Sequence, residues 1–234
     1  MAPPMPRVAV VTGSNRGIGP AMVRALQKAG YAVVSNGRSA MKGPGDLHVR
    51  ADVATPTGAR KLIATARKRY GRLDLLVNNV GIFRETAVSE MDLDGWEEIF
   101  DSNLRSAWHC CREALPLLRR RKGAVINFGS PMAHMARANP RIVAYQMAKT
   151  ALAVFTKSLA QAEARRGLRV NMISPGYIRT HAYAKSEIAD LTRKVPAGRL
   201  GTPEDMAQAV VWLASDAAAY VNGAIIDIGG GLWI

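Results

Sequence analysis

Short apolar runs alternate with helix-like stretches along almost the whole of this 234-residue chain. A strand buried on both faces reads as a continuous apolar run, whereas a helix repeats its apolar residues every three to four positions. The strand-like runs are 8–11, 31–35, 48–49, 73–77, 124–128, 168–173 and 225–228, and the helix-like stretches are 17–29, 55–70, 93–118, 144–166 and 203–215. Because intervening helices carry the chain back to the starting edge of a sheet, the strands should be parallel. The alternation predicts an α/β fold, a doubly wound parallel sheet of about seven strands with helices on both faces.

The length suits a single domain with one core, which we place over residues 7–234 behind a flexible, proline-rich tail over residues 1–6. No apolar run approaches the ~20 residues needed to cross a bilayer, and the N-terminus lacks the apolar region of a signal peptide. The two cysteines, Cys110 and Cys111, are adjacent and sit in an apolar helical stretch, so we expect buried free thiols. These features predict a cytoplasmic protein, and no ligand spacing indicates a metal site.

Basic residues are in excess, and they are unevenly distributed. The formal charge is +14, and residues 1–80 hold 13 Lys and Arg against 3 Asp and Glu. Such a field could attract nucleic acid, an anionic surface, an acidic protein or a phosphorylated cofactor, or it could be a solvated face. No nucleic-acid-binding motif is present, so we expect no nucleic-acid or membrane partner. A binder of nucleic acid or of anionic surfaces remains an alternative that salt-dependent duplex binding would test.

The first apolar run leads directly into a glycine-rich turn that opens a helix. Glycine permits positive φ and lets the backbone approach a pyrophosphate, and the helix N-terminus then offers free N–H groups. This context favours a Rossmann-like dinucleotide site over the alternative of a purely structural turn. The expected cofactor-binding residues here are Gly13, Ser14, Asn15, Arg16, Gly17, Ile18 and Gly19.

The second apolar run is followed by Arg38 and Ser39 rather than by a carboxylate. An acidic residue at this position would hold a free ribose 2′-hydroxyl, whereas an arginine suits a 2′-phosphate because its planar fork donates two hydrogen bonds together. Arg16 lies on the same side. The pattern predicts NADP(H) in preference to NAD(H), with a plain surface charge at Arg38 as the alternative.

Tyr145 and Lys149 lie four residues apart in a helical stretch, so they should share a face. A phenol titrates near pH ~10, too high for a good acid or base at neutral pH. A lysine ammonium nearby favours the phenolate, and a second cation such as an oxidised nicotinamide would add to this effect. The pair is therefore a candidate proton-transfer centre, although the same spacing also arises in helices without any such role.

These motifs, taken together and in this order, resemble those of the short-chain dehydrogenase/reductase family from Arg7 to the C-terminus. The elements that carry the resemblance are Thr12-Gly-x-x-x-Gly-Ile-Gly19, Asp52-Val53, Asn78-Asn-Val-Gly81, Asn103, Ser130, Tyr145-x-x-x-Lys149 and Pro175-Gly176.

The resemblance implies roles for individual residues. Tyr145 matches the catalytic acid/base, and Lys149 matches the lysine that lowers the phenol pKa and holds the nicotinamide ribose. Ser130 matches the serine that binds the substrate oxygen, and Asn103 the asparagine that helps hold a relay water. The remaining cofactor contacts implied are Asp52 and Val53 at the adenine, Asn79 and Gly81 along the cofactor, and Pro175, Gly176, Ile178 and Thr180 near the carboxamide.

Two departures from the family pattern stand out. The gap between Ser130 and Tyr145 is two residues longer than usual, and Met132 occupies the customary position of the serine. We expect Ser130 to be the functional hydroxyl, with the excess in a longer loop over 135–143. The segment 39–47 is short, and it should lack the full helix that relatives carry there.

The substrate is less constrained than the reaction. The tail over residues 195–231 resembles that of bacterial 3-oxoacyl-(acyl-carrier-protein) reductases, and Arg121 and Arg166 fall where those enzymes receive the acidic carrier. A carrier-bound 3-oxoacyl thioester is therefore one candidate. A free small ketone, a sugar or a cyclic carbonyl compound is the other, and a non-catalytic NADP(H)-binding sensor is a remote alternative. Relatives are usually tetramers, so we expect a homotetramer paired through the helices around 104–120 and 145–166 and through the last strand and Leu232–Ile234.

Overall fold

The computed structural model describes residues 5–39, 43–131, 138–181 and 183–232. Its seven strands form one parallel sheet in the order β3-β2-β1-β4-β5-β6-β7. The strands are β1 (Arg7–Val11), β2 (Tyr31–Gly37), β3 (Leu47–Arg50), β4 (Leu75–Asn78), β5 (Ala124–Phe128), β6 (Arg169–Pro175) and β7 (Ile225–Ile228). The predicted doubly wound, Rossmann-like sheet is confirmed.

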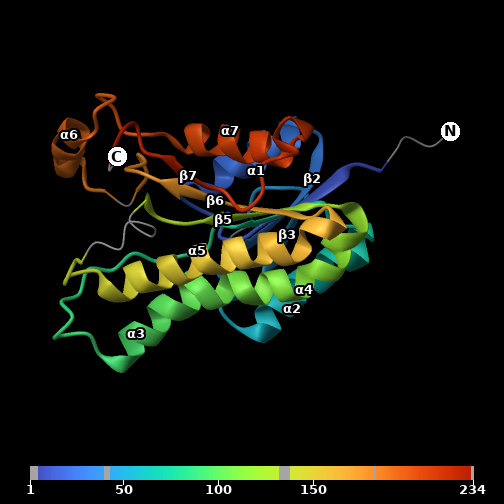
Figure 1. Cartoon of the computed structure of the whole chain (residues 1–234), viewed down its shortest axis with the longest axis horizontal. Helices are drawn as coiled ribbons and strands as arrows, with labels where there is room; N and C mark the ends of the chain where they lie inside the picture. The colour runs from blue at the N-terminus through green and yellow to red at the C-terminus, as the bar shows by residue number, and fades with distance from the viewer. Residues whose placement is uncertain (1–4, 40–42, 132–137, 182, 233–234) are drawn as a thin grey trace.

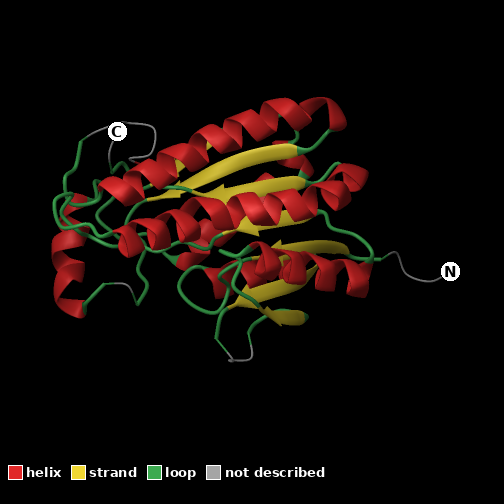
Figure 2. Cartoon of the chain, turned by 90° about the horizontal axis from the view of Figure 1, so that it is seen from below, coloured by secondary structure: helices red, strands yellow, loops and turns green. Residues whose placement is uncertain are grey.

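The described residues form seven α-helices, five of which cover the two faces of this sheet. They are α1 (Gly19–Lys28), α2 (Pro56–Tyr70), α3 (Leu93–Phe100), α4 (Ser106–Arg121), α5 (Val143–Glu163), α6 (Lys185–Lys194) and α7 (Pro203–Ala214). Helices α1 and α7 pack together on one face, and α2, α4 and α5 cover the other, as Figure 1 shows. Seen from below, the second layer of helices lies in front of the strands and runs roughly along them (Figure 2). Each face of the sheet therefore buries its own apolar cluster.

Local signals explain where several helices begin. Thr55 and Thr202 precede prolines at the starts of α2 and α7, and each threonine hydroxyl accepts a hydrogen bond from a backbone N–H of the first turn, with N···O distances of 3.1 and 3.2 Å. A proline in the first turn costs no hydrogen bond, because its N–H would have no partner there.

Three details differ from the prediction or complete it. The stretch 93–118 holds two helices, α3 and α4, and a π-helical turn, Asp101–Arg105, joins them. Helix α6 lies in a charged segment to which the sequence assigned no regular structure. As expected, no helix occurs between β2 and β3 in the residues described there, 38–39 and 43–46.

Other expectations can be compared only in part. Cys110 and Cys111 are buried free thiols, as predicted, and burial raises the pKa of both. Within the described residues no helix is long and apolar enough to span a membrane. The expected tail over 1–6 falls largely outside the described residues, as do 135–137 of the expected loop over 135–143, Met132 and the C-terminal Trp233 and Ile234. The rest of that loop, 138–142, is described and has no helix or strand, and Val143 begins α5.

Candidate active site

The polar residues predicted for the site follow the carboxyl ends of neighbouring strands. Thr12 follows β1, Arg38 follows β2, Asn79 follows β4 and Ser130 lies two residues beyond β5. Because all strands are parallel, these ends meet along one edge of the sheet, which we call the carboxyl edge. The opposite edge, where the strands begin, is called the amino edge.

The glycine-rich turn has the backbone that a pyrophosphate cradle requires. Gly13 and Gly17 have φ of +60° and +62°, and a Cβ on Gly19 would lie 2.5 Å from the Cα of Ser14. No side chain caps the N-terminus of α1, which starts at Gly19. The Gly19 N–H donates to the carbonyl oxygen of Arg16 at 3.3 Å and Pro20 has no N–H, so this end attracts an anion mainly through the helix dipole. The turn therefore fits a dinucleotide phosphate.

Thr12 and Asn79 fasten this turn to the end of β4. The Thr12 hydroxyl accepts hydrogen bonds from the backbone N–H groups of Asn79 and Val80, at 3.0 and 3.2 Å. The Asn79 amide donates to the carbonyl oxygens of Thr12 and Gly13, at 3.2 and 2.9 Å. These bonds fix the two segments that would flank a cofactor.

Arg38 is positioned at the open end of β2. Its side chain is 61% exposed, and its nearest carboxylate oxygen, on Asp52, lies 3.8 Å away, beyond hydrogen-bond distance. Ser39 accepts a 3.0 Å hydrogen bond from the amide of Asn15, which ties this segment to the glycine turn. Arg16, the residue after Asn15, is exposed. The guanidinium of Arg38 is thus available to a phosphate.

Asp52 and Val53 lie just after β3, as the sequence predicted for an adenine site. Asp52 accepts a hydrogen bond from the backbone N–H of Ala54 at 3.0 Å, which shapes the turn into α2. The side chain of Val53 is buried in the core cluster beneath α2, so it supports this wall from inside.

Tyr145 lies in the first turn of α5 and is partly buried, with its hydroxyl hydrogen-bonded to the side chain of Ser130. The ring of Phe83 packs edge-on against it, with 5.1 Å between centroids. Ser130 itself is buried. The predicted pairing of these two hydroxyls is therefore present, despite the longer spacing between them in the sequence.

Lys149 lies one turn further along α5 and is buried. Its ammonium donates a 2.7 Å hydrogen bond to the carbonyl oxygen of Phe128, the last residue of β5, and lies 5.8 Å from the centre of the Tyr145 ring. Burial lowers the pKa of Lys149 to about 8. A fraction of this group is consequently neutral near physiological pH.

The expected acidification of Tyr145 by Lys149 is not present in the chain by itself. The pKa of Tyr145 is raised to about 12, mainly by burial, while the hydrogen bond from Ser130 opposes the rise. The physical reason is that burial favours the neutral phenol, whereas the Lys149 ammonium donates to the Phe128 carbonyl oxygen. Any lowering of the phenol pKa must come from a further positive charge.

Asn103 lies in the π-helical turn, which packs against α5. Its amide nitrogen donates to the carbonyl oxygens of Ile82 and Ile99, at 2.9 and 3.0 Å, whereas its buried Oδ1 has no partner in the described chain. A Cβ on Gly81 would lie 2.6 Å from this Oδ1 and 3.2 Å from Lys149 Nζ. Glycine at 81 thus keeps a small space open between the two polar groups.

The segment after β6 forms another wall. Gly176 passes so close to Gly229 that a Cβ would lie 2.6 Å from its Cα, and buried Ile178 pairs with Gly201. Further along, Tyr183 packs edge-on against Tyr177, with 6.0 Å between centroids, and Tyr183 acts electrostatically on Tyr145. Pro175 and Thr180 belong to the same segment. Phe83 therefore packs directly against the candidate acid, while Tyr177 and Tyr183 pack against each other in the segment after β6.

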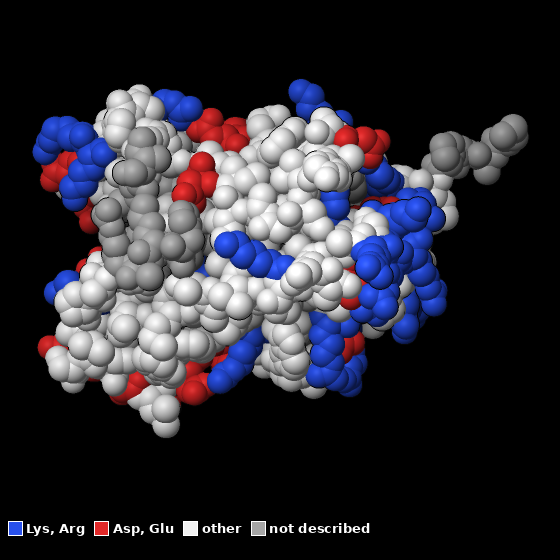
Figure 3. Space-filling view, in the orientation of Figure 1, with Lys and Arg blue, Asp and Glu red and all other residues white. Residues whose placement is uncertain are grey.

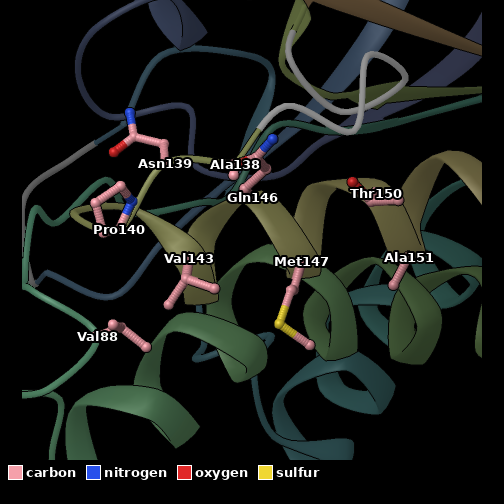
Figure 4. A pocket seen from close by; sticks show the side chains of 9 residues that line it. All are labelled: Val88, Ala138, Asn139, Pro140, Val143, Gln146, Met147, Thr150 and Ala151. Atoms are coloured by element: carbon pink, nitrogen blue, oxygen red, sulfur yellow. The ribbon is translucent and has the colours of Figure 1, made fainter.

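A hollow of about 610 Å³ lies on the outer side of α5 (Figure 4). It is lined by Val88, Ala138, Asn139, Pro140, Val143, Gln146, Met147, Thr150 and Ala151. Tyr145, Ser130 and Lys149 do not line it, because they project from other faces of the helix or from β5. We therefore do not assign it as the substrate cleft.

The basic residues gather at the amino edge, away from this site. Figure 3 shows the largest group of Lys and Arg at the end of the molecule where the chain enters β1. It includes the C-terminal ends of α2, α4 and α5, with Arg67, Lys68, Arg69, Arg119, Arg120, Arg121, Lys122, Arg165 and Arg166. Arg166 is 21 residues from Tyr145, about 30 Å along a helix. The predicted carrier-binding arginines are thus remote from the catalytic group of their own chain.

Sequence reasoning missed two kinds of contributor. Thr12 stood inside a quoted motif, yet its role as the clasp of the turn depends on β4 lying next to β1. The carbonyl of Phe128 that orients Lys149 leaves no side-chain signal at all. Phe83 and Tyr183 could have been suspected only as aromatic residues near predicted strand ends.

Comparison with known proteins gives consistent matches. A family model described as enoyl-(acyl carrier protein) reductase matches residues 13–233. The 3-oxoacyl-[acyl-carrier-protein] reductase of Escherichia coli is 34% identical over 97% of this chain and 98% of its own, and that of Staphylococcus aureus 33% over 98% and 99%. The ligand-free aldohexose dehydrogenase of Thermoplasma acidophilum has a similar structure, with a TM-score of 0.90 at 28% identity, over 97% of this chain and 93% of its own.

Proposed function

Because the chain belongs to the short-chain dehydrogenase/reductase family, an oxidoreductase family, we propose that it is an NADP(H)-dependent enzyme that interconverts a carbonyl group and a secondary alcohol. The observation that supports this proposal best is the buried set of Ser130, Tyr145, Lys149 and Asn103 at the carboxyl edge. A bound nicotinamide would supply or accept the hydride. The protein would contribute orientation and proton transfer.

In the direction of reduction, the hydroxyls of Ser130 and Tyr145 together hold the substrate oxygen. The raised pKa keeps Tyr145 protonated, so that it can give its proton to that oxygen as negative charge develops. Lys149, fixed by the Phe128 carbonyl, then stabilises the tyrosinate. A water in the space beside Gly81 would join Asn103 Oδ1 to Lys149 and return a proton from solvent.

We propose that the cofactor is held by the residues predicted for it. The glycine turn would bind the pyrophosphate, and Arg38 with Ser39 and Arg16 would bind the 2′-phosphate. Support comes from the absence of a carboxylate at the end of β2, from the 3.8 Å gap between Arg38 and Asp52, and from the uncapped start of α1. We further propose that the cofactor is NADP(H) and that the protein is located in the cytoplasm.

Two substrate classes have separate support. A 3-oxoacyl thioester on an acidic acyl carrier protein is supported by the names of the reductases matched and by exposed Arg121 and Arg166. Since Arg166 lies about 30 Å along the helix from Tyr145 of its own chain, the carrier would have to serve the site of a neighbouring subunit. A free sugar or cyclic carbonyl compound is supported by the ring of Phe83 against Tyr145 and by the ring pair of Tyr177 and Tyr183 after β6, which suit stacking against a ring.

We propose a homotetramer that pairs through α4 and α5. Trp108 on α4 and Met147 and Val154 on α5 are 43%, 47% and 61% exposed, and Met147 lines the apolar hollow in Figure 4. Such surface is normally covered. Light scattering at micromolar concentration should give four times the chain mass, and Val154→Asp should lower it. A monomeric wild type would contradict this proposal.

The decisive experiment measures NADPH and NADH oxidation with acetoacetyl thioesters, free and carrier-bound, against a panel of ketones and sugars. Carrier-dependent turnover that Arg121→Glu abolishes would select the first substrate class. Turnover of free ring compounds that Arg121→Glu leaves unchanged would select the second. No turnover with any carbonyl compound in either direction would contradict the enzymatic proposal itself.

A further inference from the structure

A second cavity, of about 700 Å³, lies at the amino edge of the sheet, far from Tyr145. The starts of β1, β2, β5 and β6 form its floor, and the ends of α4 and α7 form its sides. Its charged lining consists of Arg7, Asp74, Arg121, Lys122, Arg169 and Asp216. Four cations therefore face two carboxylates across a concave surface of the size that small ligands occupy.

One of the two carboxylates is already occupied. Asp74 accepts two hydrogen bonds from Arg72, at 2.8 and 2.7 Å, and one from the backbone N–H of Val8 at 2.8 Å. Arg121 reaches it only as an ion pair at 3.5 Å. Asp74 is thus committed mainly to Arg72, which leaves the cavity cations short of negative charge.

Arg169 is the clearest sign of that deficit. Its Nη1 is buried without a hydrogen-bond partner in the described chain, and its Nη2 lies 3.5 Å from the carbonyl oxygen of Ser215. Asp216 attracts it, but no carboxylate oxygen of the described residues lies within ion-pair distance of it. Partial burial of a guanidinium without a fixed counter-charge lowers the stability of the fold, unless a bound anion supplies that charge.

Lys122 gives an independent indication. Among the described residues it is the one non-glycine with positive φ, 49°, at the left-handed position that ends α4. Glycine is the usual residue there, and a lysine costs about 1 kcal/mol. Its side chain lies against Gly167, where a Cβ would come within 3.1 Å of it, and it has no ion pair among the described residues. The strain keeps a free ammonium at the rim of the cavity.

We propose that this cavity binds a small phosphate-bearing anion through Arg7, Lys122 and Arg169. Arginine forks and a lysine ammonium are the groups that recognise phosphoryl oxygens. Tyr31, beneath the guanidinium of Arg7 at 4.6 Å, and the exposed ring of Tyr220 add aromatic walls that a nucleotide would use and a plain phosphate would not. A concave site suits a small anion better than the convex surface of a folded acidic protein.

The test is isothermal titration with inorganic pyrophosphate, and separately with ADP, on protein saturated with NADP⁺ so that the proposed cofactor cleft is filled. Wild type should bind one pyrophosphate per chain at this second site. Arg169→Gln and Lys122→Gly should each weaken binding about tenfold or more, as expected for loss of a charged hydrogen bond. Arg24→Gln, which removes a similar exposed charge from α1, should leave it unchanged.

Lys122→Gly also separates a binding role from a structural one, because relief of the positive φ should raise the melting temperature while pyrophosphate affinity falls. Tighter binding of ADP than of pyrophosphate would assign the ligand as a nucleotide, and equal binding would assign it as phosphate alone. The titration is repeated on Arg38→Asp, which alters the proposed cofactor cleft and not this cavity. Unchanged pyrophosphate binding would assign the binding to the cavity. No binding to wild type, or equal losses in Arg24→Gln, would overturn the proposal, as would binding of an acidic carrier protein alone.

Discussion

The carboxyl edge of the sheet, with Tyr145 and Lys149, and the amino edge, with the arginines that end α4 and α5, differ in how their charges meet water. At the carboxyl edge the buried Lys149 donates to a carbonyl oxygen, and burial lowers its pKa. At the amino edge most cations are exposed, and several pair with carboxylates, as Arg119 does with Glu163 at 2.7 and 2.8 Å.

This difference teaches that charge excess and reactivity are separate properties of this chain. Cations at the C-terminal ends of helices complement the helix dipole, which explains why the basic residues concentrate at the amino edge. Proton transfer requires groups whose pKa is shifted by burial, and at the carboxyl edge these groups are Tyr145 and Lys149. The largest group of the basic residues behind the net charge of +14 therefore lies at one end of the molecule, and the candidate catalytic residues lie toward the other.

The largest effect should come from Tyr145→Phe. The ring remains to pack against Phe83, but the transferable proton is lost, so turnover should fall by about 10³-fold or more. Stopped-flow or steady-state assays with NADPH would measure the loss, and cofactor fluorescence should show unchanged binding. Residual activity within tenfold of wild type would move the acid role to another group.

The next effect concerns the cofactor. Arg38→Asp removes the partner of the 2′-phosphate and adds repulsion, so the ratio of kcat/KM for NADPH to that for NADH should fall by about 10²-fold. Arg24→Gln serves as the control for a lost exposed arginine. An unchanged ratio would mean that Arg38 does not contact the cofactor.

A third prediction concerns the pH dependence of stability. Lowering the Lys149 pKa from 10.5 to about 8 means that the buried cation costs about 3 kcal/mol below pH 8. The unfolded chain binds this proton more tightly, so the contribution to stability rises with pH between about 8 and 10.5. Lys149→Met should remove this pH dependence and the cost of about 3 kcal/mol. Because the Phe128 carbonyl also loses its donor, the net stabilisation near pH 7 should be only about 1–2 kcal/mol.

Denaturant unfolding of wild type and Lys149→Met at several pH values gives this difference directly. Turnover of the variant should be nearly abolished, since nothing then stabilises the tyrosinate. A variant less stable than wild type at pH 7, or one with the same slope above pH 8, would contradict the assignment of Lys149 as a destabilising cation.

The smallest effect belongs to the amino edge. Arg119→Gln leaves the buried carboxylate of Glu163 without its bidentate partner and should cost about 1–2 kcal/mol of stability at neutral pH. The Arg119 hydrogen bonds lower the pKa of Glu163, so this contribution should vanish as the pH falls through the acid range. Turnover of a free ketone should stay within twofold of wild type, and a large kinetic loss would show that the two edges are coupled.

The strands and the order of motifs could be predicted because both depend on local patterns. Apolar runs marked the strands, and the glycines, Arg38 and Tyr145 follow or adjoin them as the parallel sheet requires. Helix α6 was missed because its ten residues are mostly polar and none is buried, so the sequence shows no apolar stripe.

Within the candidate site, side-chain identities were predictable and their environments were not. The sequence shows that Lys149 follows Tyr145 by one turn, but not that the Phe128 carbonyl takes up the ammonium. Burial at the junction of α5, β5 and the π-helical turn reverses the direction expected for the Tyr145 pKa. Such effects depend on distant segments meeting in space, which spacing along the chain does not encode.

The π-helical turn between α3 and α4 has a further consequence. The turn is equivalent to one residue inserted into an otherwise continuous α-helix. Each residue of an α-helix is rotated by about 100° about the helix axis relative to the one before it. Deleting one residue between 101 and 105 would restore an ordinary helix but turn α3 by that angle relative to α4. The seam of α3 against α5 and the inward aim of Asn103 could then not both survive, so this irregular turn sets the rotational phase that joins scaffold to site.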